Sequence, residues 1–334
     1  MATTFFVEKI KVKAIQIQQT GSFNVLEYVD IETPIPAAGQ VLIKVESISV
    51  NFADTMVRWG NYAPMPKLPA ILGMECSGFV EALAEDINQF SPGQRVACMG
   101  EKCYADHVLA NSDSLIPIPD IIDMDEAAAF PINYLTAYHM LNTMARVQPG
   151  ETVLCYAAAG GVGVAVAQLS KLANITTIGL TSTDEKAVFA QNQGHNHVIN
   201  YKKENVVKRV REITDGKGVN VILNSVAEKS FSIDFKLLAP LGQIIWFGFA
   251  GGALETDLTK RLSVTYNQSL GVRTFYLHSV PRDIMLKSIG ILLDYLAKKK
   301  IKPFIYERIP LSDAARAHQL IESGATMGKI ILKP

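Results

Sequence analysis

The stretch VLCYAAAGGVGVAVAQ, residues 153–168, decides the fold of this chain because it joins an apolar strand to a glycine-rich turn and then to an amphipathic helix. Gly160 and Gly161 have no side chains, so the backbone can turn tightly and approach a pyrophosphate. Gly163 lets the helix pack close to the strand behind it, and the free N–H groups of the first helical turn face an anion. The segment therefore predicts a phosphate-binding turn.

This turn is a variant of the dinucleotide-binding fingerprint G-x-G-x-x-G, with Ala158 in place of the first glycine and Val162 within it. The helix carries an apolar face, and a second strand, ITTIGL at residues 175–180, follows it. Strands and helices then alternate, which predicts an α/β fold with a doubly wound parallel sheet. A buried Gly/Ala turn without a ligand is the alternative interpretation.

The composition is that of a globular protein with two domains. The chain has 334 residues, of which 49% are hydrophobic and 19% charged, so it can bury a sizeable core. Its 32 acidic and 32 basic residues balance, which gives no basis for a nucleic-acid or membrane-surface partner. A small metabolite is the expected ligand.

The cysteines and the N-terminus indicate a cytoplasmic protein. The four cysteines, at positions 76, 98, 103 and 155, form no C-x-x-C pair, so free thiols in a reducing compartment are expected. The N-terminal segment lacks the apolar core of a secretory signal, and no apolar run is long enough to span a bilayer.

The region before residue 130 is expected to be all-β. Runs such as VLIKVESISV at 41–50 and ECSGFVEALA at 75–84 have strand composition, and prolines separate them. Helices are then expected at DEAAAF, residues 125–130, and at YLTAYHML, residues 134–141. Later helices are expected around 185–193, 206–213, 231–238, 282–299 and 311–322, followed by a closing strand.

Four separated segments have a familiar order and spacing. They are SISVNFADTMVRWGNY at 47–62, LPAILGMECSGFVEAL at 68–83, YAAAGGVGVAVAQLSK at 156–171, and the block from HVINYKKE at 197–204 to the closing GKIIL. Together they resemble the medium-chain dehydrogenase/reductase superfamily and, within it, the zinc-free quinone oxidoreductases related to zeta-crystallin. The resemblance covers nearly the whole chain.

The resemblance implies a domain organisation. A GroES-like β-rich substrate domain would span residues 1–131 and be completed by 275–334, and a Rossmann domain binding NADPH would span 132–274. Substrate and nicotinamide would meet between them. The family also implies a homodimer, for which a strand at 253–265 and the segment 266–274 are the candidate contacts.

The family's zinc alcohol dehydrogenases hold a catalytic zinc through a Cys, a His and a further Cys or acidic residue. This chain has Asn51 at the first position, Met74 at the second, and Ile132 and Asn133 near the third. The resemblance therefore implies no metal.

Without a Lewis acid, hydride must go to an acceptor that delocalises the developing charge, such as a quinone or another α,β-unsaturated carbonyl. The resemblance places Asn51 and Tyr62 in the substrate cleft as donors, and Asp54 as the residue that orients its neighbours and the ribose end of the nicotinamide. Met56 stands where many relatives carry a tyrosine. A turn capped by side chains is the alternative for Asn51 and Asp54, and a surface aromatic is the alternative for Tyr62.

The cofactor is expected to be NADPH. The second strand ends in Thr181 and Ser182 rather than in the acidic residue that binds the ribose of NAD. Lys186 and Tyr201 match the positions that hold the 2′-phosphate in NADPH-using relatives, and Ser182 completes that set. NAD binding by an inward-turned Asp184 is the alternative.

Other candidate cofactor residues follow later strands or begin the linking helix. Asn224 and the pair Phe247 and Gly248 end strands at the carboxyl edge of the sheet, where ligands bind in such folds. The resemblance adds Val272 near the carboxamide, and Asn133 and Thr136 could touch the phosphates or the amide.

Two rival functions remain. GNYAPMPKLPA at 60–70 is also similar to 2-enoyl thioester reductases, in which the tyrosine matching Tyr62 donates a proton. Some relatives instead bind NADPH in structural or interaction roles without turnover.

Overall fold

The computed structural model describes residues 11–227, 230–254 and 257–334. It divides into two compact units, one made of Met1–Pro131 and Ile305–Pro334 and the other of Ile132–Phe304. The division at residue 131 coincides with the expected one. Residues 275–304, however, belong to the second unit rather than to the first. The reason is the packing of α9 (Arg282–Ala297), which buries Leu292 and Leu296 and places Ser288 Oγ 3.0 Å from His139 Nε2.

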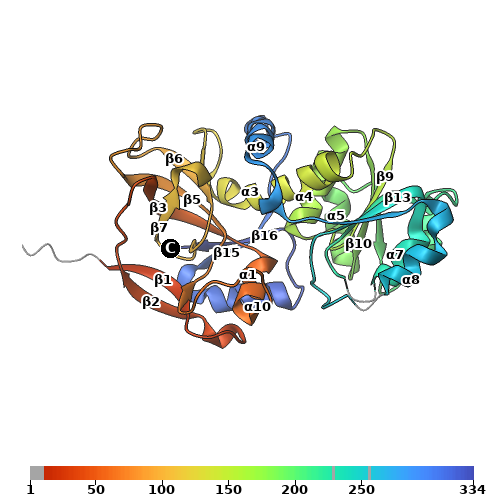
Figure 1. Ribbon diagram of the computed structural model, residues 1–334, viewed down its shortest axis with the longest axis horizontal. Coiled ribbons are helices and arrows are strands. Elements are labelled where there is room, and N and C mark those ends of the chain that lie inside the picture. Colours follow the sequence, from red (N-terminus) through yellow and green to blue (C-terminus); the bar gives the residue numbers. More distant parts are fainter. Residues whose placement is uncertain (1–10, 228–229, 255–256) are drawn as a thin grey trace, which may run out of the picture. The chain divides into compact units, whose positions relative to one another are not determined.

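The first unit is built from two sheets (Figure 1). A three-stranded antiparallel sheet has the order β2 (Glu27–Glu32), β1 (Lys11–Ile17) and β4 (Ala70–Ile71). The larger, seven-stranded sheet runs β15 (Ile305–Pro310), β16 (Lys329–Lys333), β3 (Gln40–Val50), β5 (Glu75–Leu83), β6 (Arg95–Met99) and β8 (Leu115–Pro117), and β7 (His107–Asn111) also pairs with β3.

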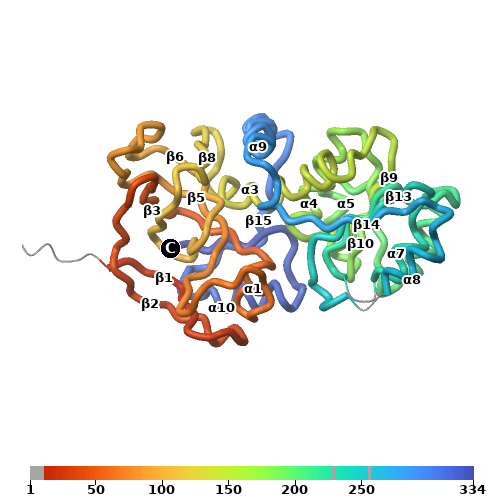
Figure 2. The backbone as a smooth tube through the Cα atoms, viewed as in Figure 1, coloured from red at the N-terminus to blue at the C-terminus, as the bar shows by residue number. Residues whose placement is uncertain are grey.

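The C-terminal segment returns to the first unit, as the blue trace among the red and orange strands shows (Figure 2). Strand β16 pairs antiparallel with β3, so that Ile330 lies opposite Val50. This pairing joins residues from opposite ends of the chain in one sheet. It also buries Ile330 and Leu332 in the main hydrophobic core of the unit.

The region before residue 130 is not all-β, which corrects the expectation. Helix α1 (Phe52–Trp59) interrupts it directly after β3, whereas α2 (Met124–Ala129) agrees with the helix expected at 125–130. The α1 segment has a strongly amphipathic pattern, with Val57 buried, and ends at Gly60, which has φ +81°. The glycine takes up the left-handed conformation that commonly ends helices. Helix α10 (Ala314–Glu322) lies in the returning C-terminal segment.

The second unit is a parallel six-stranded sheet flanked by helices, which confirms the α/β prediction (Figure 1). Its order is β11 (His197–Asn200), β10 (Thr176–Thr181), β9 (Thr152–Cys155), β12 (Val219–Asn224), β13 (Leu238–Trp246) and β14 (Gly271–Thr274). The accompanying helices are α3 (Pro131–Tyr138), α4 (Gly161–Leu172), α5 (Asp184–Gln193), α6 (Val206–Ile213) and α7 (Phe231–Leu237).

The expected strand at 253–265 is wrong for most of its length. Residues 255 and 256 lie outside the described residues, but α8 (Leu258–Val264) occupies most of the others. Asp257 explains this local structure, because its carboxylate accepts a 3.0 Å hydrogen bond from the N–H of Lys260 and so caps the helix. Within the described ranges, no helix combines the length and apolar character needed to cross a bilayer.

Candidate functional site

The glycine-rich turn lies between β9 and α4, as the fingerprint predicts. A Cβ on Gly163 would lie 2.4 Å from the carbonyl oxygen of Ala158, so only glycine lets the helix approach the turn this closely. Gly160 differs, because a Cβ there would lie 3.2 Å from the carbonyl oxygen of Ala157 and its φ of −80° suits any residue. The two glycines therefore have different structural requirements.

The N-terminus of α4 fits an anionic ligand. Gly160 is the N-cap and carries no side chain, so no side-chain oxygen caps this helix. The first turn, formed by Gly161, Val162 and Gly163, follows the carboxyl end of β9, where N–H groups are oriented outward. Such groups are suited to the pyrophosphate of a dinucleotide.

Ser182 and Tyr201 lie at the carboxyl ends of two adjacent strands, and Lys186 lies in the first turn of α5, which follows one of them. Strands β10 and β11 are paired so that Thr181 lies opposite Asn200, which places Ser182 and Tyr201 one residue past that pair. Burial lowers the pKa of the Lys186 ammonium, and the nearby positive charge of Lys202 lowers it further while Glu185 opposes it. Two neighbouring cationic side chains are suited to a phosphate dianion. Lys202 is not among the residues that the sequence predicts for this site, and it comes near Lys186 only in the folded chain.

Asp184 turns toward other partners. Its carboxylate accepts a 2.7 Å hydrogen bond from Asn200 Nδ2 and forms an ion pair with Lys203. The contact with Lys203, and to a lesser extent the hydrogen bond from Asn200, lower the pKa of the Asp184 carboxyl group. The Asp184 carboxylate, which follows the second strand of the sheet, is thus held by Asn200 and Lys203.

The side chain of Asn224 is hydrogen-bonded within the second unit. Its Nδ2 donates to Ser230 Oγ at 2.9 Å and to Asp234 Oδ2 at 2.6 Å, and its Oδ1 accepts from the N–H groups of Val226 and Ala227, both at 2.9 Å. An amide side chain has two donors and two acceptor positions. All four are used to hold the turn after β12, and a role of Asn224 at the cofactor stays a prediction.

The remaining cofactor candidates lie at ends of their elements. Phe247 and Gly248 follow β13, and a Cβ on Gly248 would lie 2.9 Å from the carbonyl oxygen of Ser225, so the backbone there is closely packed. Val272 lies in β14, at the edge of the sheet. Asn133 and Thr136 are buried on α3, three residues apart and so on one face of that helix.

In the first unit, Asn51 lies at one edge of the sheet, where one strand ends and its two neighbours begin. It follows the last residue of β3, Glu75 begins β5, and Lys329 begins β16. The sheet order places β16, β3 and β5 side by side, so the three side chains meet although the chain separates them widely. All three are buried, with Lys329 5% and Glu75 0% exposed.

The contacts among these residues are short and polar. Lys329 Nζ donates to Asn51 Oδ1 at 2.7 Å and lies 3.2 Å from Glu75 Oε1. Asn51 Nδ2 donates to Glu75 Oε1 at 3.0 Å, and Ser49 Oγ donates to the same oxygen at 2.8 Å. We call Asn51, Glu75 and Lys329 the buried polar triad.

Asp54 supports the triad from α1. Its Oδ2 accepts the N–H of Asn51 at 2.8 Å and the hydroxyl of Tyr104 at 3.2 Å. Burial raises the pKa of Asp54 to about 7, although the bond from Asn51 and the charge of Lys329 oppose the shift. The Tyr104 hydroxyl also lies 3.1 Å from His318 Nε2, and burial lowers the pKa of His318 to about 3. The hydrogen bond from the Asn51 N–H to the Asp54 carboxylate fixes the backbone at Asn51.

Tyr62 lies just beyond the end of α1. It is half-buried and packs against the main hydrophobic core of the first unit. Asn51 and Asp54 are thus in contact through the cap of α1, and Tyr62 follows the same helix.

A catalytic zinc does not fit these residues. Asn51 and Met74 occupy two of the family's ligand positions, and an amide oxygen and a thioether are poor partners for zinc. The Asn51 oxygen is engaged by the ammonium of Lys329, whose charge opposes a divalent cation beside Glu75.

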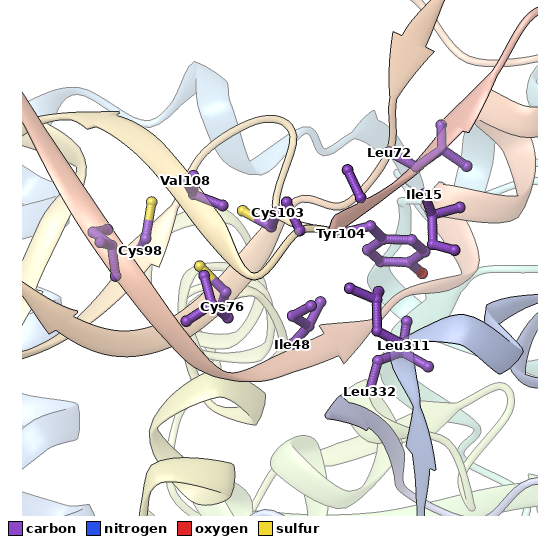
Figure 3. Close-up of a cluster of buried hydrophobic side chains, with 14 of the residues drawn as sticks. Ile15, Ile48, Leu72, Cys76, Cys98, Cys103, Tyr104, Val108, Leu311 and Leu332 are labelled. Carbon is purple, nitrogen blue, oxygen red and sulfur yellow. The ribbon is translucent and has the colours of Figure 1, made fainter. Parts of the chain in front are cut away.

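Three cysteines come together in the core of the first unit, which the sequence spacing did not predict. Cys76, Cys98 and Cys103 have their sulfur atoms within 4.8 Å of one another. Figure 3 shows them in the same buried cluster as Ile48 and Val108. The hydrogen bonds that the Cys103 thiol makes to the sulfurs of Cys76 and Cys98 favour its protonated form and, together with burial, raise its pKa. The cysteines are free and act as small apolar residues of this core.

Comparison with known proteins gives matches over both units. Residues 37–120 match the alcohol dehydrogenase GroES-like domain, and residues 193–332 match a family described as zinc-binding dehydrogenase. A quinone oxidoreductase of Rattus norvegicus is 33% identical over 96% of this chain and 97% of its own length. A quinone oxidoreductase of Pseudomonas aeruginosa is 34% identical over 96% and 99%.

Solved structures agree with this similarity. The crystal structure of Escherichia coli quinone oxidoreductase complexed with NADPH has a TM-score of 0.91 and 31% identity, and the match covers 96% of this chain and all of that one. The similarity extends over the whole chain, both units share the fold, and the zinc ligands are replaced. The chain therefore belongs to the zinc-free quinone oxidoreductase family of the medium-chain dehydrogenases/reductases.

Proposed function

We propose that this protein is an NADPH-dependent reductase that transfers hydride to a quinone or another α,β-unsaturated carbonyl without zinc. The observation that carries the proposal is the buried polar triad at the family's metal position. An acceptor bound there has no Lewis acid to polarise it, so it must delocalise the developing negative charge itself. Quinones and enones do so. The similarity to quinone oxidoreductases over the whole chain supports the same class of enzyme.

NADPH, when bound, supplies the hydride. The N–H groups at Gly161, Val162 and Gly163 would hold its pyrophosphate. Ser182, Lys186 and Tyr201 would hold its 2′-phosphate, with Lys202 as a further cation. The engagement of Asp184 by Lys203 and Asn200 supports NADPH over NAD, because that carboxylate would repel the 2′-phosphate if it turned inward.

The nicotinamide end would be held by other elements of the second unit. Phe247 and Gly248 follow β13, and the backbone of Val272 lies in the neighbouring strand β14. Asn133 and Thr136 on α3 are the further candidates.

The first unit would stabilise the reduced acceptor. A hydride added to a quinone ring or to the β-carbon of an enone leaves an oxyanion, and the Asn51 amide can donate a hydrogen bond to it. Asp54 holds the backbone N–H of Asn51 and so keeps that residue in place. Tyr62 is the candidate for a second hydrogen bond to that oxyanion, and it would be the proton donor in an enoyl reductase.

A screen of NADPH oxidation over small quinones, enones and enoyl thioesters tests this function. Consumption of NADPH with quinones or enones, at rates well above those with NADH, is the expected result. Turnover of none of these acceptors by protein that binds NADPH would contradict the proposal and favour an interaction role. The chain also resembles a protein that is named for a vesicle membrane and not for an enzyme activity. This is the human synaptic vesicle membrane protein VAT-1 homolog-like protein, with 30% identity and a TM-score of 0.86.

A 2-enoyl thioester reductase is the second candidate. A Mycobacterium tuberculosis polyketide synthase subunit is 29% identical over 95% of this chain, which matches 14% of that larger protein. The segment 60–70 also resembles the enoyl reductases around the tyrosine at 62. In such an enzyme the enolate carbon must be protonated within the site, so a general acid matters more than in a quinone reductase.

Tyr62→Phe separates the two candidates. A quinone reductase should lose roughly tenfold in kcat, because solvent can protonate the product oxygens and only a hydrogen bond is lost. An enoyl reductase should lose about 10²–10⁴-fold. We expect the smaller loss, measured with the best quinone of the screen. A loss of more than about a hundredfold at unchanged NADPH affinity would promote the enoyl reductase.

Two further features belong to the proposal. A homodimer would form through β14, whose outer side is the edge of the parallel sheet, and through the exposed side chains of Val264 and Tyr266. A cytoplasmic location remains a prediction from the cysteine content and the N-terminal sequence.

A further inference from the structure

The buried polar triad contains an amide whose orientation is determined by its two charged neighbours. The Lys329 ammonium can only donate hydrogen bonds, and the Glu75 carboxylate can only accept them. Asn51 Oδ1 therefore faces Lys329 at 2.7 Å, and Nδ2 faces Glu75 Oε1 at 3.0 Å. A rotation of the amide by 180° would set N–H groups against the ammonium and oxygen against the carboxylate. Both of those contacts are repulsive.

The fixed orientation limits what Asn51 can offer to a ligand. One of its two Nδ2 hydrogens is used by Glu75, so a single N–H remains as a donor. The ammonium withdraws electron density from the carbonyl oxygen, which polarises the amide and strengthens that N–H as a donor. The triad thus converts an amide with two possible orientations into a directed hydrogen-bond donor.

Burial explains why both charged residues are needed. Glu75 is 0% and Lys329 5% exposed, and a buried charge is costly unless it is paired and hydrogen-bonded. Glu75 Oε1 accepts hydrogen bonds from Ser49, Asn51 and Lys329. These bonds offset the free-energy cost of burying the carboxylate charge. The two charges stabilise each other and hold the amide between them.

We propose that Lys329 is a positioning residue, which sets the orientation of the Asn51 amide so that its remaining N–H is directed at the oxyanion of the reduced acceptor. The inference rests on the proposed function of Asn51 as that donor. Lys329 acts through Asn51 and does not itself exchange a proton.

A double-mutant cycle tests this dependence. Lys329→Met removes the ammonium and keeps the length of the side chain, and Asn51→Ala removes the amide. We expect Lys329→Met to lower kcat roughly tenfold to a hundredfold at an unchanged KM for NADPH. The variant carrying both changes should be no slower than Asn51→Ala alone, because Lys329 has no other route to the reaction. Additive losses would overturn the proposal.

Lys333→Met is the matched control. Lys333 lies four residues later on the same strand and pairs with Glu46 and Asp125, away from Asn51. It should leave kcat unchanged. Where Lys329→Met fails to fold because Glu75 loses its partner, the variant with both Lys329→Met and Glu75→Gln removes both charges. It should fold and still show the lowered kcat, and a rate equal to that of the unmodified protein would refute the proposal.

A spectroscopic measurement separates failure of this inference from failure of the proposed function. With nitrogen-15-labelled asparagine, the two Nδ2 hydrogens of Asn51 should give distinct resonances, one of them slow to exchange with water. Lys329→Met should speed that exchange and shift the resonances, and Lys333→Met should not. This readout needs no turnover. Unchanged Asn51 resonances in Lys329→Met would overturn the inference even if the enzyme reduces quinones.

Discussion

Lys186 is the side chain to which we assign the choice between NADPH and NADH. It is half-buried, and both burial and the neighbouring Lys202 lower the pKa of its ammonium. A dianionic phosphate placed between two such cations is stabilised by charge-assisted hydrogen bonds. Ser182 and Tyr201 follow adjacent paired strands, so they are positioned to add neutral donors.

Lys186→Ala should therefore weaken NADPH binding about tenfold and leave NADH binding nearly unchanged. A partly solvated ion pair to the 2′-phosphate contributes on the order of 1–2 kcal/mol. Fluorescence titration with both cofactors measures the difference, with Lys171→Ala, an exposed lysine at the end of α4, as the control. Equal losses for NADPH and NADH would show that Lys186 does not bind the phosphate.

Asp54 couples the stability of the first unit to pH. Its pKa is raised from 3.8 to about 7, mainly by burial, so the folded state binds a proton more tightly than the unfolded chain. The stability that this proton contributes is present below about pH 4 and is lost as the pH rises through about 7. His318, with its pKa lowered to about 3, acts in the opposite direction.

Asp54→Asn should remove the loss of stability that Asp54 causes as the pH rises. The free energy of unfolding of the variant, relative to the unmodified protein, should rise by up to about 4 kcal/mol between pH 4 and pH 8, from about three pKa units at 1.36 kcal/mol each. Urea unfolding across this range measures it, and the comparison cancels the contribution of His318. Asp215→Asn, at an exposed position, is the control. A constant difference at all pH values would contradict the assignment.

At the scale of elements, the turn before α4 combines two kinds of glycine. Gly163 is required by the fold, because a Cβ would lie 2.4 Å from the backbone of Ala158. Gly160 is compatible with a side chain in the folded protein, because its φ is −80° and a Cβ would meet only the Ala157 oxygen at 3.2 Å. Its side of the turn is the one from which a pyrophosphate would approach.

The two positions should respond differently to substitution. Gly160→Val should abolish NADPH binding while costing on the order of 1 kcal/mol of stability, the usual loss at an N-cap. Gly163→Ala should cost roughly 1–3 kcal/mol by overpacking. Thermal unfolding and cofactor titration of both variants measure this pattern. Retained NADPH binding by Gly160→Val would refute the phosphate-binding turn.

At the scale of the whole molecule, each unit has its own hydrophobic core, and the chain leaves the first unit and returns to it. The edge of the second sheet at β14 leaves main-chain groups available for pairing. Near it, Tyr266 is 82% and Val264 65% exposed. These features are typical of a surface that a second copy covers.

Sedimentation should therefore report a dimer. Tyr266→Asp combined with Val264→Asp should shift the protein to monomers, because the two charges oppose burial of that surface. Ile35→Asp, at an equally exposed apolar position of the first unit, should leave the dimer intact. A monomer at micromolar concentration in the unmodified protein would eliminate the proposed assembly.

The sequence by itself determined the features that depend on neighbouring residues. The turn at 158–163, the alternation of strands and helices after it, and the helices at α5, α6 and α9 follow from periodicity and turn residues. Helix α1 was missed because it is short and lies between strand-like runs, and α8 was mistaken for a strand although Asp257 caps it.

The tertiary structure alone decided the contacts between distant residues. Asn51 and Lys329 are 278 positions apart and meet only because β16 pairs with β3. The same applies to the cysteine cluster, which comes from separate segments, and to the hydrogen bonds that fully occupy Asn224. A sequence pattern reports which residues share a face of one element. Which buried charges and amides compensate one another depends on strand order, because only strand pairing brings those groups within hydrogen-bonding distance.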